Sequence, residues 1–490
     1  MTKPLICATV TGSTTAELRR RRDEVVDADL VELRLDSVSD PNVAGALAGR
    51  RRTVIVTCRP SWEGGRFAGS EEERKKLLAE ALSLGAEYVD LEWRAHFDDL
   101  IAQTGGQRIV LSMHDFEGMP PDVAACVQDL RATGAEIVKL AVKATRLSDC
   151  VPLLELGAQA GRHGGLVLVA MGEYGVATRV LARRFGSMWT YAGLERNVGQ
   201  LTPTALVDEF HFRSLTESTD LYGLVGSPVA HSVSPAMHNA AFRASRLDAV
   251  YLPFLATDSD DFITFARAIG LKGASVTIPF KRSLFDRVDE ADAVARRIGA
   301  INTIRIVDGR WIGGNTDATG FLKPLRDRVP LSGARVALLG AGGAARAVAI
   351  ALASSGAHVT VHARNRRQAE DVAMTVSGRV GVWPPEAGTW DLLINCTPVG
   401  MYPRGNETPV AAERLTGRCV YDLVYNPSRT RLLREAAVAG CQTIGGLDML
   451  VGQAQEQFEW WFGARPPAGV MREAALKRLA EFSRDENHVV

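Results

Sequence analysis

Short apolar runs recur along the first part of the chain, separated by segments with helical spacing. The eight runs are LICATV (5–10), LVELRL (30–35), TVIVTC (53–58), YVDLEW (88–93), RIVLSM (108–113), EIVKLA (136–141), LVLVAM (166–171) and SMWTYA (187–192). Between two of them, SEEERKKLLAEALSLG (70–85) places apolar residues at helical spacing. Strands that alternate with helices indicate parallel βαβ units, and eight units predict an α/β fold of the (β/α)8 barrel type. An open doubly wound sheet is the alternative.

The pattern changes after Thr204. A helix-like segment and the polar stretch FRSLTESTD (212–220) precede a new strand-like run, LYGLVG (221–226). Exposed polar stretches of this kind join domains. We therefore expect a barrel domain over 1–212 and a second α/β unit over 220–490, which ends in a closing helix at 472–482.

One continuous strand–helix–strand pattern in the second unit, residues 335–364, contains G-x-G-x-x-A at Gly340, Gly342 and Ala345. An apolar strand precedes the glycines and an Ala-rich helix follows, which is the context of a dinucleotide site. Glycines there let backbone N–H groups and the helix N-terminus approach a pyrophosphate closely. The pattern predicts nucleotide binding by this unit.

The stretch VHARNRR (361–367) ends the second strand of that pattern. An NAD enzyme usually carries Asp or Glu there, whereas this chain has Arg364, followed by Arg366 and Arg367. A guanidinium suits a 2′-phosphate, so the pattern favours NADP over NAD. An exposed basic loop without a ligand is the other interpretation.

Composition narrows the class of protein. The chain has 490 residues, of which 46% are apolar and 23% charged, with 57 basic and 57 acidic side chains, so no polyanionic partner such as nucleic acid is indicated. Seven cysteines without a CxxC pattern favour free thiols in a reducing compartment, and cysteine and histidine are not at zinc-site spacings, so we expect no metal. No apolar stretch has the length of a membrane span, and a strand-like run begins near the N-terminus, so we expect a cytoplasmic protein that does not contact a membrane.

Polar side chains fall at the ends of several predicted barrel strands. They are Glu32, Arg34, Arg59, His114 and Lys139. In a (β/α)8 barrel the chemistry gathers at the C-terminal ends of the strands, so we expect these residues to converge at one mouth. Each alone could be a strand-end charge that reaches solvent.

Lys139 is flanked by Ile137, Val138, Leu140 and Ala141 in an apolar strand-like run. Desolvation disfavours the ammonium form, lowers the pKa of a lysine and frees the amine as a nucleophile, typically for a Schiff base with a ketone. A base must then remove the acidified proton on the neighbouring carbon, and His114 at the preceding strand end is the candidate, with Glu63 as the group that orients its imidazole. A purely structural strand-end lysine is the alternative.

The first half resembles type I 3-dehydroquinate dehydratase in the motifs VELRLD, CRPSWEGG, SMHDF, EIVKLAV and GVATRVLARRFGSMWTYA. The resemblance implies that Lys139 forms the imine with the C3 ketone of dehydroquinate and that His114, supported by Glu63, takes the C2 proton. It further implies a set of substrate-binding residues: Glu32, Arg34, Arg59, Arg179 (on the carboxylate) and Gln200. ERNVGQ (195–200) departs from the family, because Arg196 stands where a substrate-contacting Ser is expected.

The second half resembles shikimate dehydrogenase in six motifs: GSPVAHSVSPAMHNAAF, SVTIPFK, GAINT, GGNTDATG, YDLVYNPSRTRLL and GGLDMLVGQAQEQF. The resemblance implies a catalytic pair, Lys281 and Asp317. Implied substrate-binding residues are Ser232, Ser234, Thr277, Asn302, Tyr425 and Gln453. Implied NADP-binding residues are Gly340, Ala341, Gly342, Gly343, Ala344, Arg364, Thr397 and Met401.

The resemblance also implies two lobes in the second unit: a substrate lobe over about 220–322 with the C-terminal helix, and a Rossmann lobe over about 330–460. The two implied reactions are consecutive, because the product of the dehydratase, 3-dehydroshikimate, is the substrate of the reductase. The sequence therefore predicts a bifunctional enzyme whose partners are these small molecules. The alternative is a quinate/shikimate dehydrogenase with a dehydratase half of altered or lost activity.

Overall fold

A computed structural model describes residues 5–160, 164–194, 199–326 and 328–486. The chain divides into two compact units. The first holds the residues up to Leu221 together with Val250–Leu271, and the second holds Tyr222–Ala249 and the residues from Lys272 onward. Within the described part of the chain, no helix is both long and apolar enough to cross a membrane.

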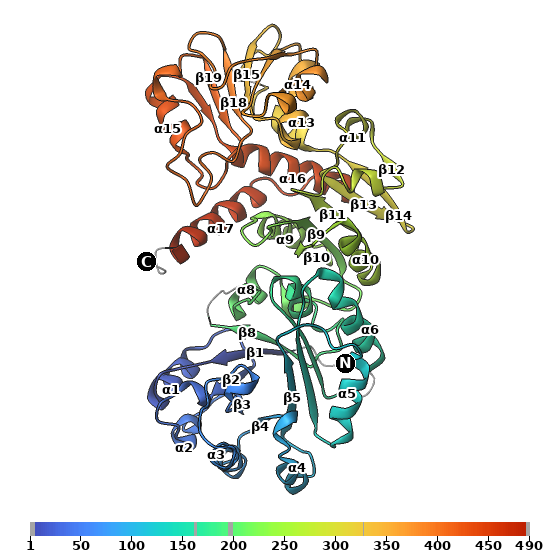
Figure 1. Ribbon diagram of the computed structural model, residues 1–490, viewed down its shortest axis with the longest axis vertical. Helices are drawn as coiled ribbons and strands as arrows, with labels where there is room; N and C mark the ends of the chain where they lie inside the picture. Colours follow the sequence, from blue (N-terminus) through green and yellow to red (C-terminus); the bar gives the residue numbers. More distant parts are fainter. Residues whose placement is uncertain (1–4, 161–163, 195–198, 327, 487–490) are drawn as a thin grey trace. The chain divides into compact units, whose positions relative to one another are not determined.

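The first unit is built on an eight-stranded parallel sheet (Figure 1). Its strands are β1 (Leu5–Val10), β2 (Leu30–Arg34), β3 (Thr53–Thr57), β4 (Tyr88–Glu92), β5 (Ile109–Asp115), β6 (Ile137–Lys143), β7 (Leu166–Met171) and β8 (Trp189–Gly193). The order β7-β6-β5-β4-β3-β2-β1-β8 runs through consecutive strands and turns back to β8 beside β1, which makes a nearly closed barrel. The predicted barrel is confirmed, because a doubly wound sheet would reverse its strand order at a switch point.

Helices follow most of the strands. They are α1 (Thr15–Glu24), α2 (Val43–Leu47), α3 (Glu71–Ser83), α4 (Asp98–Thr104), α5 (Val123–Ala132), α6 (Cys150–Ala160), α7 (Val176–Val180) and α8 (Pro203–Asp208). In α3, Ser70 and Glu73 form a capping box, which satisfies backbone N–H groups at the start of the predicted helix. Short 3-10 turns follow several of the strands, among them η4 (Leu147–Asp149) after β6 and η5 (Glu173–Gly175) after β7.

Two elements from later in the sequence belong to this unit by their packing. They are most of β10 (Ala249–Leu255) and α10 (Ser259–Ile269). Helix α10 packs against η4 and α6, with Phe262, Phe265 and Ile269 buried.

The second unit contains a mixed sheet in which its strands follow the order β9-β11-β13-β14-β12. These strands are β9 (Asp220–Gly226), β11 (Gly273–Val276), β12 (Glu290–Ala291), β13 (Thr303–Val307) and β14 (Arg310–Gly314). Strand β11 pairs parallel to β9 and antiparallel to β13. Three helices accompany the sheet: α9 (Ser234–Ala244), α11 (Ala293–Ile298) and α12 (Asp317–Leu322).

The other sheet of this unit is parallel throughout and has the order β17-β16-β15-β18-β19-β20. Its elements are β15 (Arg335–Leu339), α13 (Gly343–Ser354), β16 (His358–His362), α14 (Arg366–Met374), β17 (Arg379–Val380), β18 (Leu392–Asn395), β19 (Cys419–Asp422), α15 (Arg431–Val438) and β20 (Gln442–Ile444). The order is that of a Rossmann sheet, with the glycine-rich turn after its first strand. Helices α16 (Gly446–Phe462) and α17 (Val470–Glu486) end the chain, and α17 contains the predicted closing helix.

Candidate active sites

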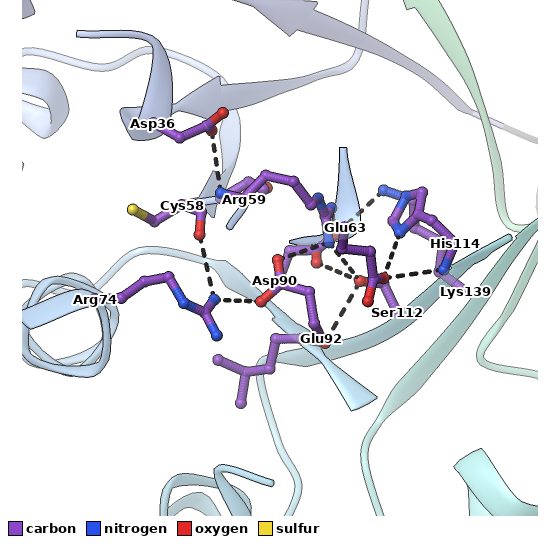
Figure 2. Close-up of polar contacts among 12 residues, drawn as sticks. Asp36, Cys58, Arg59, Glu63, Arg74, Asp90, Glu92, Ser112, His114 and Lys139 are labelled. Carbon is purple, nitrogen blue, oxygen red and sulfur yellow. Dashed lines mark hydrogen bonds and ion pairs between the residues drawn. The ribbon is translucent and has the colours of Figure 1, made fainter. Parts of the chain in front are cut away.

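The amine of Lys139 lies inside the barrel beside two carboxylates. Its Nζ is 3.1 Å from Asp90 Oδ2 (Figure 2). It is also 3.5 Å from Glu32 Oε1 and 4.1 Å from the centre of the Tyr191 ring. The apolar sequence neighbours of Lys139 do not surround its amine, whereas Glu32, one of the polar residues expected at the same mouth, lies beside it. Successive side chains of a strand point to opposite faces, so Val138, next to Lys139 in sequence, does not define the surroundings of the amine.

Asp90 is held as a carboxylate by its own partners. Arg59 pairs with Asp90 Oδ2 at 3.0 Å and Ser112 Oγ donates to Oδ1 at 2.6 Å. Burial raises the pKa of Asp90, but the charges of Arg59 and Lys139 outweigh burial and the pKa is lowered below its ordinary value. An ionised acceptor therefore faces the lysine amine.

Arg59 is fully engaged within the protein. Besides Asp90 it contacts Glu92 Oε1 at 2.7 Å and Ser112 Oγ at 2.8 Å, and its side chain is buried. Burial lowers its pKa, but the carboxylates of Asp90 and Glu92 raise it further, so the pKa is above its ordinary value. Glu92 also pairs with the buried guanidinium of Arg74 (Figure 2).

Sequence reasoning did not single out Asp90, Glu92 or Ser112. The signal was present, because YVDLEW carries two carboxylates at alternate positions of an apolar strand. Alternate positions share one face of a strand. In the parallel register Glu92 pairs with Ser112 and Ser112 with Lys139, which brings these three side chains into one row across β4, β5 and β6.

His114 and Glu63 form a close pair, as expected. Glu63 Oε1 accepts a hydrogen bond from the backbone N–H of His114 at 2.9 Å and lies 2.9 Å from its ring Nδ1. Burial, then the charges of Arg59 and Lys139, lower the pKa of His114, which leaves the imidazole neutral near pH 7. Burial raises the pKa of Glu63 to about 7.

Glu32 and Arg34 have different surroundings. Glu32 accepts hydrogen bonds from Thr9 Oγ1 at 2.9 Å and Thr57 Oγ1 at 3.1 Å, so it is fixed toward Lys139. Arg34 makes a bidentate pair with Asp36 at 2.7 and 2.8 Å and keeps 22% of its side chain exposed. Arg34 therefore lies at the rim of the cluster, with Nε and one Nη already bonded.

Arg179 on α7 is a buried cation held by carbonyl groups. Its Nη1 donates to Ala170 O at 2.6 Å and Gly175 O at 3.3 Å, and no carboxylate among the described residues pairs with it. Burial lowers its pKa to about 10, so it is charged near pH 7. Gln200 is exposed, and Arg196 lies outside the described residues.

In the second unit Lys281 and Asp317 form the expected pair. Lys281 Nζ lies 2.5 Å from Asp317 Oδ2, while Asn302 Nδ2 donates to Asp317 Oδ1 at 2.8 Å. Gln453 Oε1 is 3.4 Å from the same Asn302 nitrogen. The structure thus gathers four of the predicted residues from separate segments, with Lys281 18% exposed.

The other predicted substrate residues of this unit line nearby loops. Ser232 Oγ accepts from the backbone N–H of Ser234, the first residue of α9, at 3.1 Å. The loop before them is tied to the segment of Thr277, because Ser227 N donates to Ile278 O at 2.9 Å. Tyr425 is half-buried, and burial raises its pKa.

The glycine-rich turn after β15 leaves room for a ligand. Gly340 has φ +101°, a conformation that favours glycine, and at Gly342 a Cβ would meet no atom within 4 Å. At Gly343, the first residue of α13, the nearest atom to such a Cβ is Lys281 Cδ at 4.0 Å. The open turn, with its neighbours Ala341 and Ala344, therefore lies beside the Lys281 cluster, at a helix N-terminus that favours anions.

The other predicted cofactor residues follow strands β16 and β18. Arg364 follows β16 and is exposed, with no ion pair to another described residue, whereas Arg366 pairs with Glu370 at 3.0 Å. Thr397 donates through Oγ1 to Asn395 Oδ1 at 2.6 Å, and Met401 is 44% exposed.

Both halves of the chain match known families. Residues 6–217 match type I 3-dehydroquinase, 224–304 the shikimate dehydrogenase substrate binding domain, and 446–476 the shikimate 5′-dehydrogenase C-terminal domain. The bifunctional 3-dehydroquinate dehydratase/shikimate dehydrogenase, chloroplastic, of Arabidopsis thaliana is 33% identical over 506 residues, which cover 94% of this chain and 83% of that protein. The chain belongs to this bifunctional family. The predicted resemblance of both halves is confirmed.

Other relatives are similar to the second half of the chain alone. The shikimate dehydrogenase (NADP(+)) of Methanopyrus kandleri is 43% identical over 284 residues, which cover 54% of this chain and 98% of that protein. A solved structure of a shikimate dehydrogenase in complex with NADP+ matches with a TM-score of 0.51 and 37% identity over 54% of this chain and 97% of its own. The second half of this bifunctional family member thus corresponds to a whole shikimate dehydrogenase.

Proposed function

We propose that the chain dehydrates 3-dehydroquinate to 3-dehydroshikimate in its barrel and reduces that product to shikimate with NADPH in its second unit. The first reaction is supported by the buried amine of Lys139, which lies on the strand next to that of His114. The observation that carries the second is the Lys281–Asp317 pair beside an open glycine-rich turn.

In the barrel, Lys139 attacks the C3 ketone of dehydroquinate and loses water to form an imine. The amine must be neutral to attack, and the ionised Asp90, 3.1 Å away, orients it by accepting a hydrogen bond. The protonated imine makes the C2 proton acidic. His114 removes that proton and returns it to the C1 hydroxyl, which leaves as water. Hydrolysis of the imine then releases dehydroshikimate and restores Lys139.

Glu63 and the surrounding charges support these steps. Ionised Glu63 can only accept, so Nδ1 of His114 carries the proton and Nε2 is free to act as the base. Glu32 and Arg34 hold substrate hydroxyls, with Gln200 in the loop that follows β8. The guanidinium of Arg59 is already paired with Asp90 and Glu92. Arg59 therefore shapes the site by keeping Asp90 ionised.

Arg179 binds the substrate carboxylate. It is a buried cation that no described carboxylate neutralises, and a bound carboxylate would supply the missing charge. Its two carbonyl partners fix the guanidinium without neutralising it.

In the second unit, NADPH would supply the hydride, and the residues present fit it. Gly340, Gly342 and Gly343 with Ala341 and Ala344 would hold its pyrophosphate at the N-terminus of α13. Arg364, exposed after β16, would bind the 2′-phosphate, and Thr397 and Met401 would lie against the nucleotide.

The Lys281 cluster handles the substrate. Lys281 supplies the proton that neutralises the ketone oxygen as it becomes a hydroxyl, and Asp317 orients the ammonium. Asn302 holds Asp317, and Gln453, which contacts Asn302, holds the neighbouring hydroxyl. Ser232 and Ser234 bind the shikimate carboxylate, with Thr277 and Tyr425 at the edges of that site.

Incubation with dehydroquinate and NADPH tests the proposal. Dehydroshikimate absorbance should rise first and NADPH should then be consumed, with shikimate as the product. No NADPH consumption from dehydroquinate, when supplied dehydroshikimate is reduced normally, would show that the barrel is not a dehydratase. The rates of oxidation of quinate and of shikimate, each measured with NAD and with NADP, distinguish the proposed function from that of a quinate dehydrogenase.

The compartment stays a prediction. Each of the seven cysteines, all in the described part of the chain, is a free thiol, which supports a reducing environment such as the cytoplasm. The Arabidopsis relative is described as chloroplastic.

A further inference from the structure

A buried carboxylate on α10 anchors the loop that follows the Lys139 strand. The side chain of Asp261 is fully buried. Its Oδ1 accepts from the backbone N–H of Ser148 at 2.7 Å and from Arg146 Nε at 3.3 Å. Its Oδ2 accepts from the backbone N–H groups of Leu147 and Thr257, each at 3.0 Å.

These contacts require an ionised carboxylate. Burial raises the pKa of Asp261, but hydrogen bonds from the backbone of Thr257, Ser148 and Leu147 outweigh it and the pKa is lowered. Both oxygens face N–H donors, and an amide offers only one acceptor oxygen and would turn its NH2 toward the others. No neutral side chain of the same size can therefore satisfy this loop.

The anchored loop continues to the segment that holds Arg179. Ala144 N donates to Met171 O at 3.2 Å, and Cys150 Sγ lies 3.6 Å from Tyr174 O. These contacts bracket the turn after β7. Arg179 takes its two carbonyl acceptors from the ends of the same stretch, Ala170 O and Gly175 O. A continuous set of contacts thus leads from Asp261 through η4 to the guanidinium.

We propose that Asp261 is a positioning residue for the dehydratase, and that it acts through η4 on Arg179. Asp261 lies in the part of the chain, 224–304, that matches the shikimate dehydrogenase substrate binding domain, yet α10 packs in the barrel unit. A segment that follows the dehydratase half in sequence therefore anchors the loop after the Lys139 strand. This inference rests on the proposed role of Arg179 in binding the substrate carboxylate.

The position of Lys139 itself does not depend on this anchor. Lys139 lies in the middle of β6, which is paired on both sides, with Ser112 of β5 and Val167 of β7 in register. Loss of the anchor should therefore weaken substrate binding more than the chemistry. Substitution of a residue that acts on a binding site from a distance typically changes the coupling to that site by about 2-fold to 30-fold.

The experiment uses the full chain with Asp261→Asn, and with Glu155→Gln as the matched control. Glu155 is an exposed carboxylate on α6, so its amide should leave both activities unchanged. In Asp261→Asn we expect the KM for dehydroquinate to rise about tenfold with kcat within about twofold and reduction of dehydroshikimate unchanged. An unchanged KM, or a parallel fall of both activities, would overturn the proposal.

Two further variants test whether the change in KM arises from the Asp261 anchor and is transmitted to Arg179. Arg146→Gln removes a hydrogen-bond donor to Asp261 at a half-exposed side chain. It should raise the KM for dehydroquinate by about twofold even if Asp261→Asn folds poorly.

Arg179→Lys, alone and combined with Asp261→Asn, tests whether Asp261 acts through Arg179. If it does, the two effects on KM should be less than multiplicative. Multiplicative effects would overturn it. If Arg179→Lys leaves the KM unchanged, the proposed role of Arg179 in binding the carboxylate is overturned as well. If only Asp261→Asn has no effect, the role of Asp261 is overturned and that of Arg179 stands.

Discussion

One oxygen of Glu63 meets two nitrogen atoms of His114, the backbone N and the ring Nδ1, each at 2.9 Å. The other oxygen, Oε2, is buried and makes no hydrogen bond with the described residues. Glu63 lies in the turn that follows β3 and His114 lies near the end of β5, 51 residues apart. This contact fixes the plane of the imidazole and leaves Nε2 for the substrate.

The ionisation of Glu63 should control the dehydratase near neutral pH. Burial raises its pKa to about 7, and only the ionised form accepts the Nδ1 proton and frees Nε2. The dehydratase kcat should therefore rise with pH through about 7. In Glu63→Gln this rise should disappear and kcat should fall by up to about 100-fold.

The pH profile of kcat for each variant makes the check. Glu117→Gln, an exposed carboxylate in the loop after β5, is the control and should keep the wild-type profile. A Glu63→Gln enzyme that retains the rise through pH 7 would assign the titration to another group.

Lys139→Ala should abolish dehydration of dehydroquinate and leave the reduction of dehydroshikimate intact, because the amine is the nucleophile. Borohydride reduction during turnover should add a substrate-sized mass to Lys139, measured by peptide mass spectrometry. Lys143→Ala is the matched control, since Lys143 ends the same strand with an exposed side chain. An adduct that survives in Lys139→Ala would place the imine elsewhere.

Lys281→Met should lower the kcat of dehydroshikimate reduction by about 100-fold to 10,000-fold, because no group then donates the proton to the developing alkoxide. Asp317→Asn should act in the same direction through the lost 2.5 Å contact. The dehydratase activity of the same protein is the internal control. Reduction at the wild-type rate by Lys281→Met would remove the lysine from the mechanism.

Arg364→Ala should raise the KM for NADPH by about tenfold or more and leave the KM for NADH nearly unchanged, because one charge-assisted hydrogen bond to the 2′-phosphate is lost. Steady-state kinetics with each nicotinamide make the comparison. Arg366→Ala, already paired with Glu370, is the control and should change the NADPH value less. Equal effects on both nicotinamides would show that Arg364 does not read the phosphate.

Arg74→Met should destabilise the barrel unit by about 3 kcal/mol, because it leaves one oxygen of the buried Glu92 without its cation. The measurement is the urea midpoint for loss of dehydratase activity. Lys75→Met is the control. Its pair with Asp99 is partly exposed, so the cost should be under about 1 kcal/mol. Equal midpoints for the two variants would contradict the argument.

The strands of the barrel could be read directly from the chain. EIVKLA predicted a strand over 136–141, and β6 spans Ile137–Lys143; SEEERKKLLAEALSLG predicted a helix, and α3 spans Glu71–Ser83. Such patterns are local, because the alternation of side chains in a strand and their spacing on a helix depend only on neighbouring residues. The type of residue at the strand ends, including Lys139 and His114, was visible for the same reason.

The partners of those residues depended on strand register and packing. Asp90 lies 49 residues and Glu32 107 residues from Lys139, and only the closing of the barrel brings both carboxylates to the amine. The local pattern of residues is enough to indicate the eight strands, the glycine-rich turn and the reactive side chains. The fold is needed to show that Asp90 faces Lys139 and that Asp261, from a later segment, anchors the neighbouring loop. These contacts join residues far apart in sequence, and no local pattern encodes which of the many buried acids will meet a given lysine.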